Sequence, residues 1–544
     1  RDYPTIVDQT PIQAKEDKKL PLASILKIKM KKHFTASQGY VVHLNDMNGK
    51  QKAQWVYAEE QQKPISGVTY HYASNDYYAP YATDRNKGKL NNNVPVIFPN
   101  GDIKSRTIGV EYDLVHDLRE NASETQITGV NTNLAAFFVG IIPGLVPIPL
   151  PDLSSSEDQV RAVSSTKVIN TFGILVETIA YDGDTKVSTK NIAWDAMTGE
   201  VLATETVDEY NDKYYTFNYP AHWFYKGMSQ ASINLGIEGK LGLAGASAQY
   251  VMQGLPSSYM TSDFLMAGDE IAYTHSSGVK KKAWVLWVQG NTFKLIDVNG
   301  TEITSISSGT DFTVVRSARR NLQSAGIMNV TLMHHPFKDV QGNYVTNLGE
   351  NFLMGSNFEQ WKIINAGAVD YSDNWPAGCE CGIGEGKNPF VKNEKGVWRV
   401  KSSNTYLTGR NFQEKATPRM EGFFSTFQPM YRLTASHNWY KDMTNWTWVS
   451  QVSNYSAYGF EIENMDALKR YSAAQYGYNN TLPIAVGANL KYSEIAYDGF
   501  EDRGFTGCTT NSHFSSREPM LLVRDKQTEQ SVKTLLIQGN TVSV

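Results

Sequence analysis

The sequence predicts a mainly β, multidomain protein built from antiparallel sheets or sandwiches, with few short helices. A chain of 544 residues is long enough for several domains. Its 30 Tyr and 11 Trp favour half-buried pleated surfaces, and its 42 Gly supply turns. The formal net charge of -4 gives no electrostatic reason to expect nucleic acid as a partner.

Alternating runs and turn residues divide the chain into five regions. Residues 1–152 read as β-rich and end in an apolar, Pro-rich segment, and residues 153–262 as β-hairpins followed by a Gly/Ala-rich part with short helices. Residues 263–320 read as a small β module, residues 321–502 as an aromatic-rich β region, and residues 503–544 as the start of another module. The Ser-rich stretch DLSSSEDQVRAVSSTK suggests a joint between the first two regions.

The run LAAFFVGIIPGLVPIPLP, from Leu134 to Pro151, raises the question of a membrane segment. A spanning helix needs ~20 apolar residues with every backbone N–H paired, and four prolines in this run exclude that. We therefore expect no transmembrane helix but a buried extended segment packed under a neighbouring β module. The alternative is an exposed loop that binds a partner or touches a membrane.

The start of the chain and its three cysteines bear on its origin. The opening RDYPTIVDQT has neither an initial Met nor an apolar signal segment, so we expect a piece of a larger protein. Three Cys are too few for a disulfide scaffold, but Cys381 and Cys508 could form one long-range disulfide. A zinc site is disfavoured because Cys379 and Cys381 lack the paired spacing of such sites.

Two Asp-rich loops are the metal candidates. The first holds Asp182 and Asp184, and the second holds Asp498 and Asp502. Carboxylate oxygens suit Ca²⁺, although neither loop has EF-hand spacing and turn chemistry explains Asp-Gly without an ion. We expect no cofactor, with Ca²⁺ as the alternative.

The stretch 437–460 has a high aromatic density. Trp439, Trp446 and Trp448 could offer flat faces to saccharide rings, but alternation between core and surface of a sheet is the favoured explanation. His334 and His335 precede Pro336, and neighbours on a strand point to opposite faces, so we expect a strand end here and no metal site. No H-E-x-x-H or G-x-S-x-G motif occurs, which predicts a non-enzymatic protein.

Two segments share a weak pattern of Asp-Ala, a turn and a Tyr-rich strand: Trp194–Pro220 and Asn464–Pro483. With FFVGIIPGLVPIPLP and YGFEIENMDALKRYSAAQYGYNN, they make roughly residues 130–502 resemble a group of very large secreted surface proteins of Bacteroidota. In some of these, the region lies near Rhs-type tyrosine-aspartate (YD) repeats. The resemblance implies degenerate YD-like hairpins, an extracellular or cell-surface location and export by the type IX system.

These observations leave three functions open. The first is a structural or adhesive section of a large surface protein, whose partners are other segments or chains of the assembly, or type IX or outer-membrane components. The second is the scaffold of an Rhs-like toxin or delivery protein. The third is a carbohydrate-binding surface protein.

Overall fold

The protein is described by a computed structural model. It describes residues 6–19, 28–78, 89–139, 142–245, 248–319, 325–339, 341–355, 358–375, 388–411, 422–456, 458–477, 481–495, 521–524, 531–537 and 540–542. The predicted mainly β class is confirmed. The chain forms two compact units, one of residues 1–94 and 105–190, the other of residues 95–104 and 191–544.

The first unit contains two groups of strands. Its elements are β1 (Ile6–Gln9), β2 (Gln13–Lys19), β3 (Ile28–Asn45), β4 (Ala53–Tyr57), β5 (Pro64–Tyr72), α1 (Asn75–Tyr78), β8 (Val110–Val139), β9 (Ile142–Thr171) and β10 (Leu175–Asp182). β6 (Asn93–Ile97), β7 (Ile103–Thr107) and β11 (Thr185–Asp195) have residues in both units. Strands β4, β5, β10 and β11 pair in that order.

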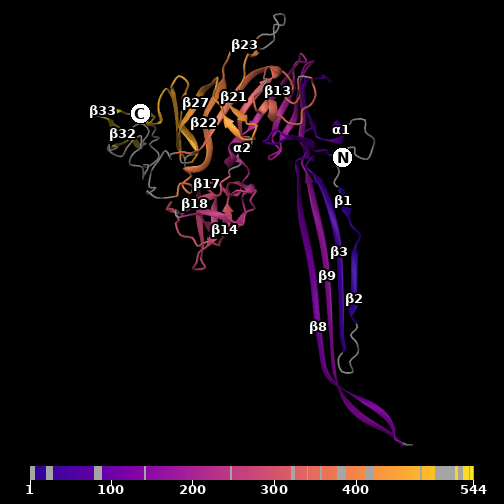
Figure 1. Cartoon of the computed structure of the whole chain (residues 1–544). Coiled ribbons are helices and arrows are strands. Elements are labelled where there is room, and N and C mark those ends of the chain that lie inside the picture. Colours follow the sequence, from indigo (N-terminus) through magenta and orange to yellow (C-terminus); the bar gives the residue numbers. More distant parts are fainter. Residues whose placement is uncertain are drawn as a thin grey trace. The chain divides into compact units, whose positions relative to one another are not determined.

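The other group forms a long sheet that we call the β-arm, with the order β1-β3-β9-β8 and β2 also paired to β3. β8 and β9 are 30 residues each and pair antiparallel from Val110↔Thr171 to Val139↔Ile142. β3 pairs parallel to β9 from Ile28↔Ser154 to Asn45↔Thr171. Among the described strands, the hairpin therefore continues with only β8 and β9 beyond the ends of β2 and β3 (Figure 1).

The Ser-rich stretch does not form the expected joint. It is a continuous part of β9, paired to β8 on one side and, from Ser154 on, to β3 on the other. The Ser-rich stretch forms a strand because β8 and β3 supply hydrogen-bond partners for its backbone N–H and C=O groups, and because Ser and Thr side chains are compatible with a strand.

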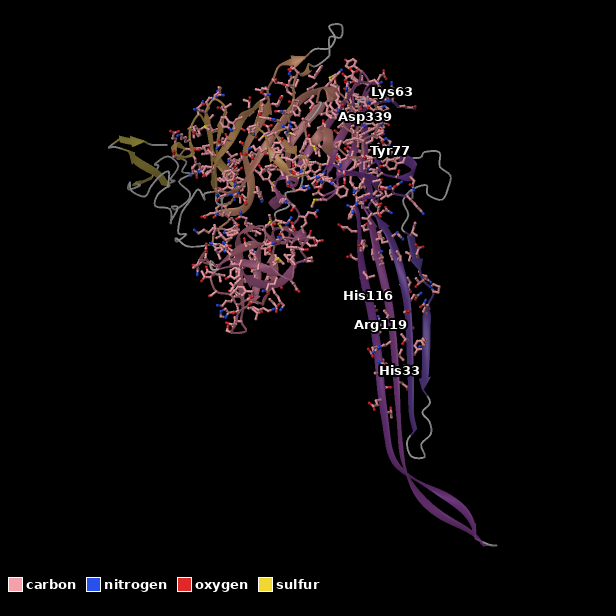
Figure 2. The ribbon with its side chains drawn as sticks, viewed as in Figure 1. His33, Lys63, Tyr77, His116, Arg119 and Asp339 are labelled. Atoms are coloured by element: carbon pink, nitrogen blue, oxygen red, sulfur yellow. The ribbon has the colours of Figure 1, made fainter. Side chains whose placement is uncertain are left out.

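The described stem of the arm exposes both of its faces. Tyr112, Leu114 and Leu118 alternate along β8 and are 69%, 60% and 61% exposed. Cross-strand polar pairs lie on the same face, including Arg161 Nε to Glu120 Oε1 at 3.0 Å. Figure 2 shows His116 and Arg119 on β8 and His33 on β3 along this stem. The stem thus depends on backbone pairing and cross-strand contacts, without a core on either face.

The second unit is organised around an antiparallel meander. Its strands follow the order β12-β13-β20-β21-β22-β27-β28-β29-β30. Their bounds are β12 (Val201–Val207), β13 (Lys213–Pro220), β20 (Gly326–Leu332), β21 (Ile363–Asn374), β22 (Lys395–Tyr406), β27 (Trp446–Tyr455), β28 (Glu461–Asp466), β29 (Tyr471–Gly477) and β30 (Leu482–Ala488).

Short elements accompany this meander and its core. They are α2 (Ala221–Phe224), η1 (Lys226–Met228), η2 (Ala231–Ile233), η3 (Gly349–Leu353), η4 (Phe358–Trp361), β23 (Arg410–Asn411), β24 (Phe423–Phe424), β25 (Tyr431–Leu433), β26 (Trp439–Lys441) and η5 (Tyr492–Glu494). Three further strands are β31 (Leu521–Arg524), β32 (Ser531–Ile537) and β33 (Asn540–Val542). The core is aromatic: Phe217 and Phe352 meet edge to face, with ring centroids 5.1 Å apart.

A closed barrel of six strands interrupts the meander between β13 and β20. Its order is β14-β15-β18-β17-β16-β19. The bounds are β14 (Glu238–Leu243), β15 (Tyr250–Gln253), β16 (Glu270–Thr274), β17 (Lys280–Gln289), β18 (Thr292–Ile296) and β19 (Thr310–Arg316), with α3 (Thr261–Phe264) between β15 and β16. The module expected at 263–320 is therefore larger, because the Gly/Ala-rich part supplies two of the strands that close it.

One turn recurs between paired segments of the second unit. Asp208 Oδ1 accepts backbone N–H groups from Tyr210 and Asp212, and Asp466 Oδ1 accepts them from Leu468 and Arg470. Asp297 and Asp339 each accept N–H groups two and four residues later in the same way. The fourth residue of each turn has a positive φ, and this residue is Asn211, Gly300, Gly342 or Lys469. The two hairpins predicted at Trp194–Pro220 and Asn464–Pro483 both form around such turns.

Asp269 fixes the base of the barrel. This carboxylate is fully buried and accepts hydrogen bonds from the Asn234 amide, from Ala318 N at 2.8 Å and from Met266 N at 2.9 Å. Burial raises its pKa, and the hydrogen bonds and Arg319 oppose that shift.

We expect Asp269→Ala to lower the free energy of unfolding of the barrel by about 2–4 kcal/mol, since it leaves buried donors without an acceptor. Unfolding followed by the fluorescence of the barrel tryptophans Trp284 and Trp287 measures this loss. Asp311→Ala, which removes an exposed carboxylate paired to Lys240 at 3.1 Å, is the control and should change stability by less than about 0.5 kcal/mol. Equal effects of the two substitutions would contradict the assignment.

Candidate interaction sites

A cavity of about 510 Å³ lies against the meander of the second unit. Strands β12, β13, β20, β21 and β22 line it, and His222 of α2 reaches it. Tyr219, Met328, Ala368 and Asn404 stand side by side in register across four of these strands. Ala368 and the neighbouring Gly367 leave room where larger side chains would fill the space.

Two buried polar side chains of this row have no hydrogen-bond partner among the described residues. Asn404 is 4% exposed, and neither its amide nitrogen nor its amide oxygen has a partner within the described part of the chain. The Tyr219 hydroxyl is fully buried and equally unpaired among those residues, and burial raises its pKa well above the usual value. The register of β22 on β27 shifts between Ser403 and Asn404, which is the bulge geometry that re-aims a side chain.

A buried carboxylate supports one end of the cavity. Asp195 accepts hydrogen bonds from Thr198 N at 2.7 Å, Thr198 Oγ1 at 2.9 Å and Trp223 Nε1 at 2.9 Å. His222 Nε2 lies 3.3 Å from Asp195 Oδ2, within ion-pair distance but not aligned for a hydrogen bond. Burial raises the pKa of Asp195, but His222 and these donors outweigh it and hold the pKa below its usual value. Asp195 therefore anchors the turn and α2.

The lining determines what the cavity can accept. It combines apolar strand residues with three amides, three hydroxyls, one carboxylate and one imidazole, which belong to Asn218, Asn329, Asn404, Thr198, Tyr219, Ser403, Glu200 and His222. Such a lining suits a ligand with both apolar surface and hydrogen-bonding groups.

The tryptophan candidates do not form a shared exposed surface. Trp446 is 7% exposed and donates Nε1–H to Gln428 O at 2.9 Å. Trp439 is half-buried and donates to Pro99 O at 3.0 Å, and Trp448 is also half-buried. This placement disfavours sugar stacking on Trp446 and favours the alternation between core and surface.

The calcium candidates divide between described and undescribed residues. Asp182 and Asp184 flank the β10–β11 turn, where Asp184 Oδ1 pairs with Lys63 Nζ at 2.5 Å. Lys63 holds the pKa of Asp184 below its usual value. Among the residues with described positions, no group of three His, Cys, Asp or Glu side chains could hold a metal ion. Asp498, Asp502, Cys381 and Cys508 lie outside the described residues.

His334 and His335 follow β20 and have different partners, as expected for a strand end. His334 Nδ1 contacts Gln360 O, whereas His335 Nδ1 accepts the N–H of Phe337 at 3.1 Å. The His335 ring packs against Tyr215 and Tyr344, with centroid distances of 5.0 and 5.4 Å.

The apolar run of Leu134–Pro151 lies at the far end of the β8–β9 hairpin. Its described residues, 134–139 and 142–151, are extended, as predicted, and they pair with each other from Leu134↔Pro147 to Val139↔Ile142. Among the described strands, no strand of a neighbouring module pairs with it, so the packing expected for it remains a prediction. No helix within the described ranges is long and apolar enough to cross a membrane.

Comparisons with known proteins add little. No known family matches the sequence, and no curated protein is significantly similar to it. A crystal structure of TcdB2-TccC3-TEV aligns with 89% of this chain at 8% identity and a TM-score of 0.19. The chain spans about a fifth of the length of that protein, 20%. A TM-score this low assigns neither a fold nor a function.

Sequence reasoning missed the row of Tyr219 and Asn404. Each is an ordinary strand residue in the sequence, and 185 positions separate them in the numbering from 219 to 404. Only the register of four strands brings them to one cavity.

We expect Asn404→Leu to leave thermal stability unchanged or to raise the free energy of unfolding by about 1 kcal/mol, because a buried unpaired amide is costly. Differential scanning calorimetry measures this change. Asn329→Leu is the matched control, since Asn329 is exposed and its amide donates to Asn218. A clear loss of stability in Asn404→Leu alone would show that the amide is a structural partner in the fold.

We expect stability to fall between pH 6.5 and pH 4 partly through His335. Burial, reinforced by Lys338, lowers its pKa to about 4 from the usual value near 6.5. The neutral His335 ring therefore makes its full contribution to the free energy of unfolding above pH 6.5. This contribution is lost as the pH falls towards 4, because the unfolded state gains a proton before the folded state does. Between pH 6.5 and pH 4, the free energy of unfolding should fall by about 1–2 kcal/mol less in His335→Gln than in the wild type, after solvent screening is allowed for. Thermal unfolding across this pH range measures the difference. Identical pH profiles would contradict this.

Proposed function

We propose that this chain is a structural and adhesive section of a large secreted cell-surface protein, with no catalytic role. The observation that carries the proposal is the β-arm, an extended sheet built on a hairpin of two 30-residue strands. At ~3.3 Å per residue, each strand is roughly 100 Å long.

The exposure of the arm supports an assembly role. Sheets of globular proteins bury at least one face, whereas the stem exposes Leu114 and Leu118 on one face and Val115 on the other, each near 60%. Sheets without a packed face are marginal alone and gain stability from partners. An arm of this kind suits contact with another segment or chain of a surface assembly.

The arm also ends in an apolar segment, which supports adhesion. A run of 18 residues without charge lies at the end furthest from the β4–β5–β10–β11 strands of the same unit. The extracellular location and export by the type IX system remain part of the proposal and rest on the resemblance given by the sequence.

A second candidate is the scaffold of an Rhs-like toxin or delivery protein. The repeated Asp turns and the long antiparallel meander of the second unit favour it. Cryo-electron microscopy of the product of the complete open reading frame tests it: the scaffold requires further hairpins that extend the meander around an interior, and an adhesive section does not.

Adhesion through the arm has a direct test. Beads coated with the full chain should be retained on cell layers roughly tenfold better than beads coated with a variant in which residues 130–151 are replaced by Asn-Gly. Val298→Asp, an exposed change on the barrel, is the control and should not alter retention. Equal retention of the shortened variant and the wild type would refute an adhesive arm.

A further inference from the structure

The end of the β8–β9 hairpin is free of charge. Ten consecutive register pairs, from Val130↔Pro151 to Val139↔Ile142, contain no Asp, Glu, Lys, Arg or His. The first charged residue is Asp152, which pairs with Gly129. We call these twenty paired residues the arm tip.

Both faces of the tip are apolar near its end. Alternate strand positions share a face, so Leu134, Ala136 and Phe138 belong to one set and Ala135, Phe137 and Val139 to the other. A protein groove that covers one face of such a hairpin would leave the other in water. A lipid phase surrounds both.

The prolines of β9 shape the edge of the tip. Four odd-numbered positions of β9 are proline: Pro143, Pro147, Pro149 and Pro151. Because hydrogen-bonded and non-hydrogen-bonded pairs alternate along an antiparallel ladder, all four prolines lie in pairs of the same type with β8. A hairpin tolerates Pro where no N–H is donated to its partner, which places their missing donors on the outer edge of β9. The third strand begins at Ile28↔Ser154, just beyond the last of these prolines. The tip therefore has few unpaired N–H groups on this edge, and an unpaired N–H is costly in lipid.

The apolar end of the tip is long enough to reach into a bilayer interface. The six pairs from Leu134↔Pro147 to Val139↔Ile142 contain only apolar residues and extend ~20 Å at ~3.3 Å each, whereas Asn131, Thr132 and Asn133 lie nearer the stem. The residues that follow carry both signs: Lys18 and Lys19 on β2 and Lys29, Lys31 and Lys32 on β3 are accompanied by Glu124 on β8 and by Asp152, Glu157 and Asp158 on β9. Charges of opposite sign nearly balance in this collar, so its attraction to charged headgroups is weak.

We propose that the arm tip inserts into the interfacial region of a lipid bilayer, with its apolar side chains at the boundary of the acyl chains, which makes a membrane the partner of the adhesive arm proposed above. Burial of apolar residues drives the contact, so it requires no anionic lipid and persists at high salt. The outer edge of β8 at the tip has no proline and keeps its N–H donors, which holds a single copy in the interfacial region.

Flotation of the full chain with phosphatidylcholine vesicles tests this proposal. The wild type should rise with the vesicles equally well in about 0.1 M and about 1 M salt. Phe137→Asp with Phe138→Asp should reduce the floating fraction at least roughly tenfold, because it places two charges in the apolar tip. Val115→Asp with Leu118→Asp makes the same change at exposed positions of the stem on the same strand and should float like the wild type.

The variants also separate misfolding from loss of binding. Phe137→Ala with Phe138→Ala keeps the strand uncharged and should reduce flotation to an intermediate degree, with an unchanged circular dichroism spectrum. A wild type that stays with the unbound protein, or flotation of the aspartate variant at the wild-type level, overturns the inference. Adhesion of beads that depends on the tip without any flotation would leave the adhesive function standing and assign its partner to a protein or glycan.

Discussion

The pairing of β8 with β9 is the interaction on which the β-arm depends. Thirty residues of each strand stay in one antiparallel register, and the described stem exposes both faces. Hydrogen bonds of the ladder and cross-strand pairs such as Glu120 with Arg161 therefore replace a hydrophobic core. Because β3 pairs with β9 only from Ser154 on, the apolar tip extends beyond the third strand. The prolines of β9 limit the pairing of a further strand at the tip.

The second unit is stabilised by a hydrophobic core, unlike the described stem of the β-arm. Its meander is covered on one face by aromatic side chains such as Phe217, Phe352 and Tyr431, so its stability comes from burial. The cavity at Asn404 and Tyr219 interrupts this packing and contains buried polar groups that have no hydrogen-bond partner among the described residues. Costly features of this kind are typical of sites kept for a ligand.

The sequence predicts local features well. The mainly β class, the hairpins at Trp194–Pro220 and Asn464–Pro483 and the strand end at His335 follow from alternation and turn chemistry, which act over a few residues. It did not predict the barrel boundary, the parallel pairing of β3 with β9 or the row from Tyr219 to Asn404. These depend on which distant strands pair, and alternation specifies a face but not a partner. The joint predicted at the Ser-rich stretch was wrong for the same reason, because this composition occurs both in joints between modules and in paired strands.

The most direct test of the arm is a distance along β8. Spin labels on Val115→Cys and Ala135→Cys, with Cys379, Cys381 and Cys508 changed to Ser, lie 20 residues apart on one strand. Electron–electron resonance should give a narrow distribution near ~66 Å, the length of 20 residues at ~3.3 Å each. A broad distribution centred well below that distance would contradict an extended hairpin that holds its apolar tip away from the stem.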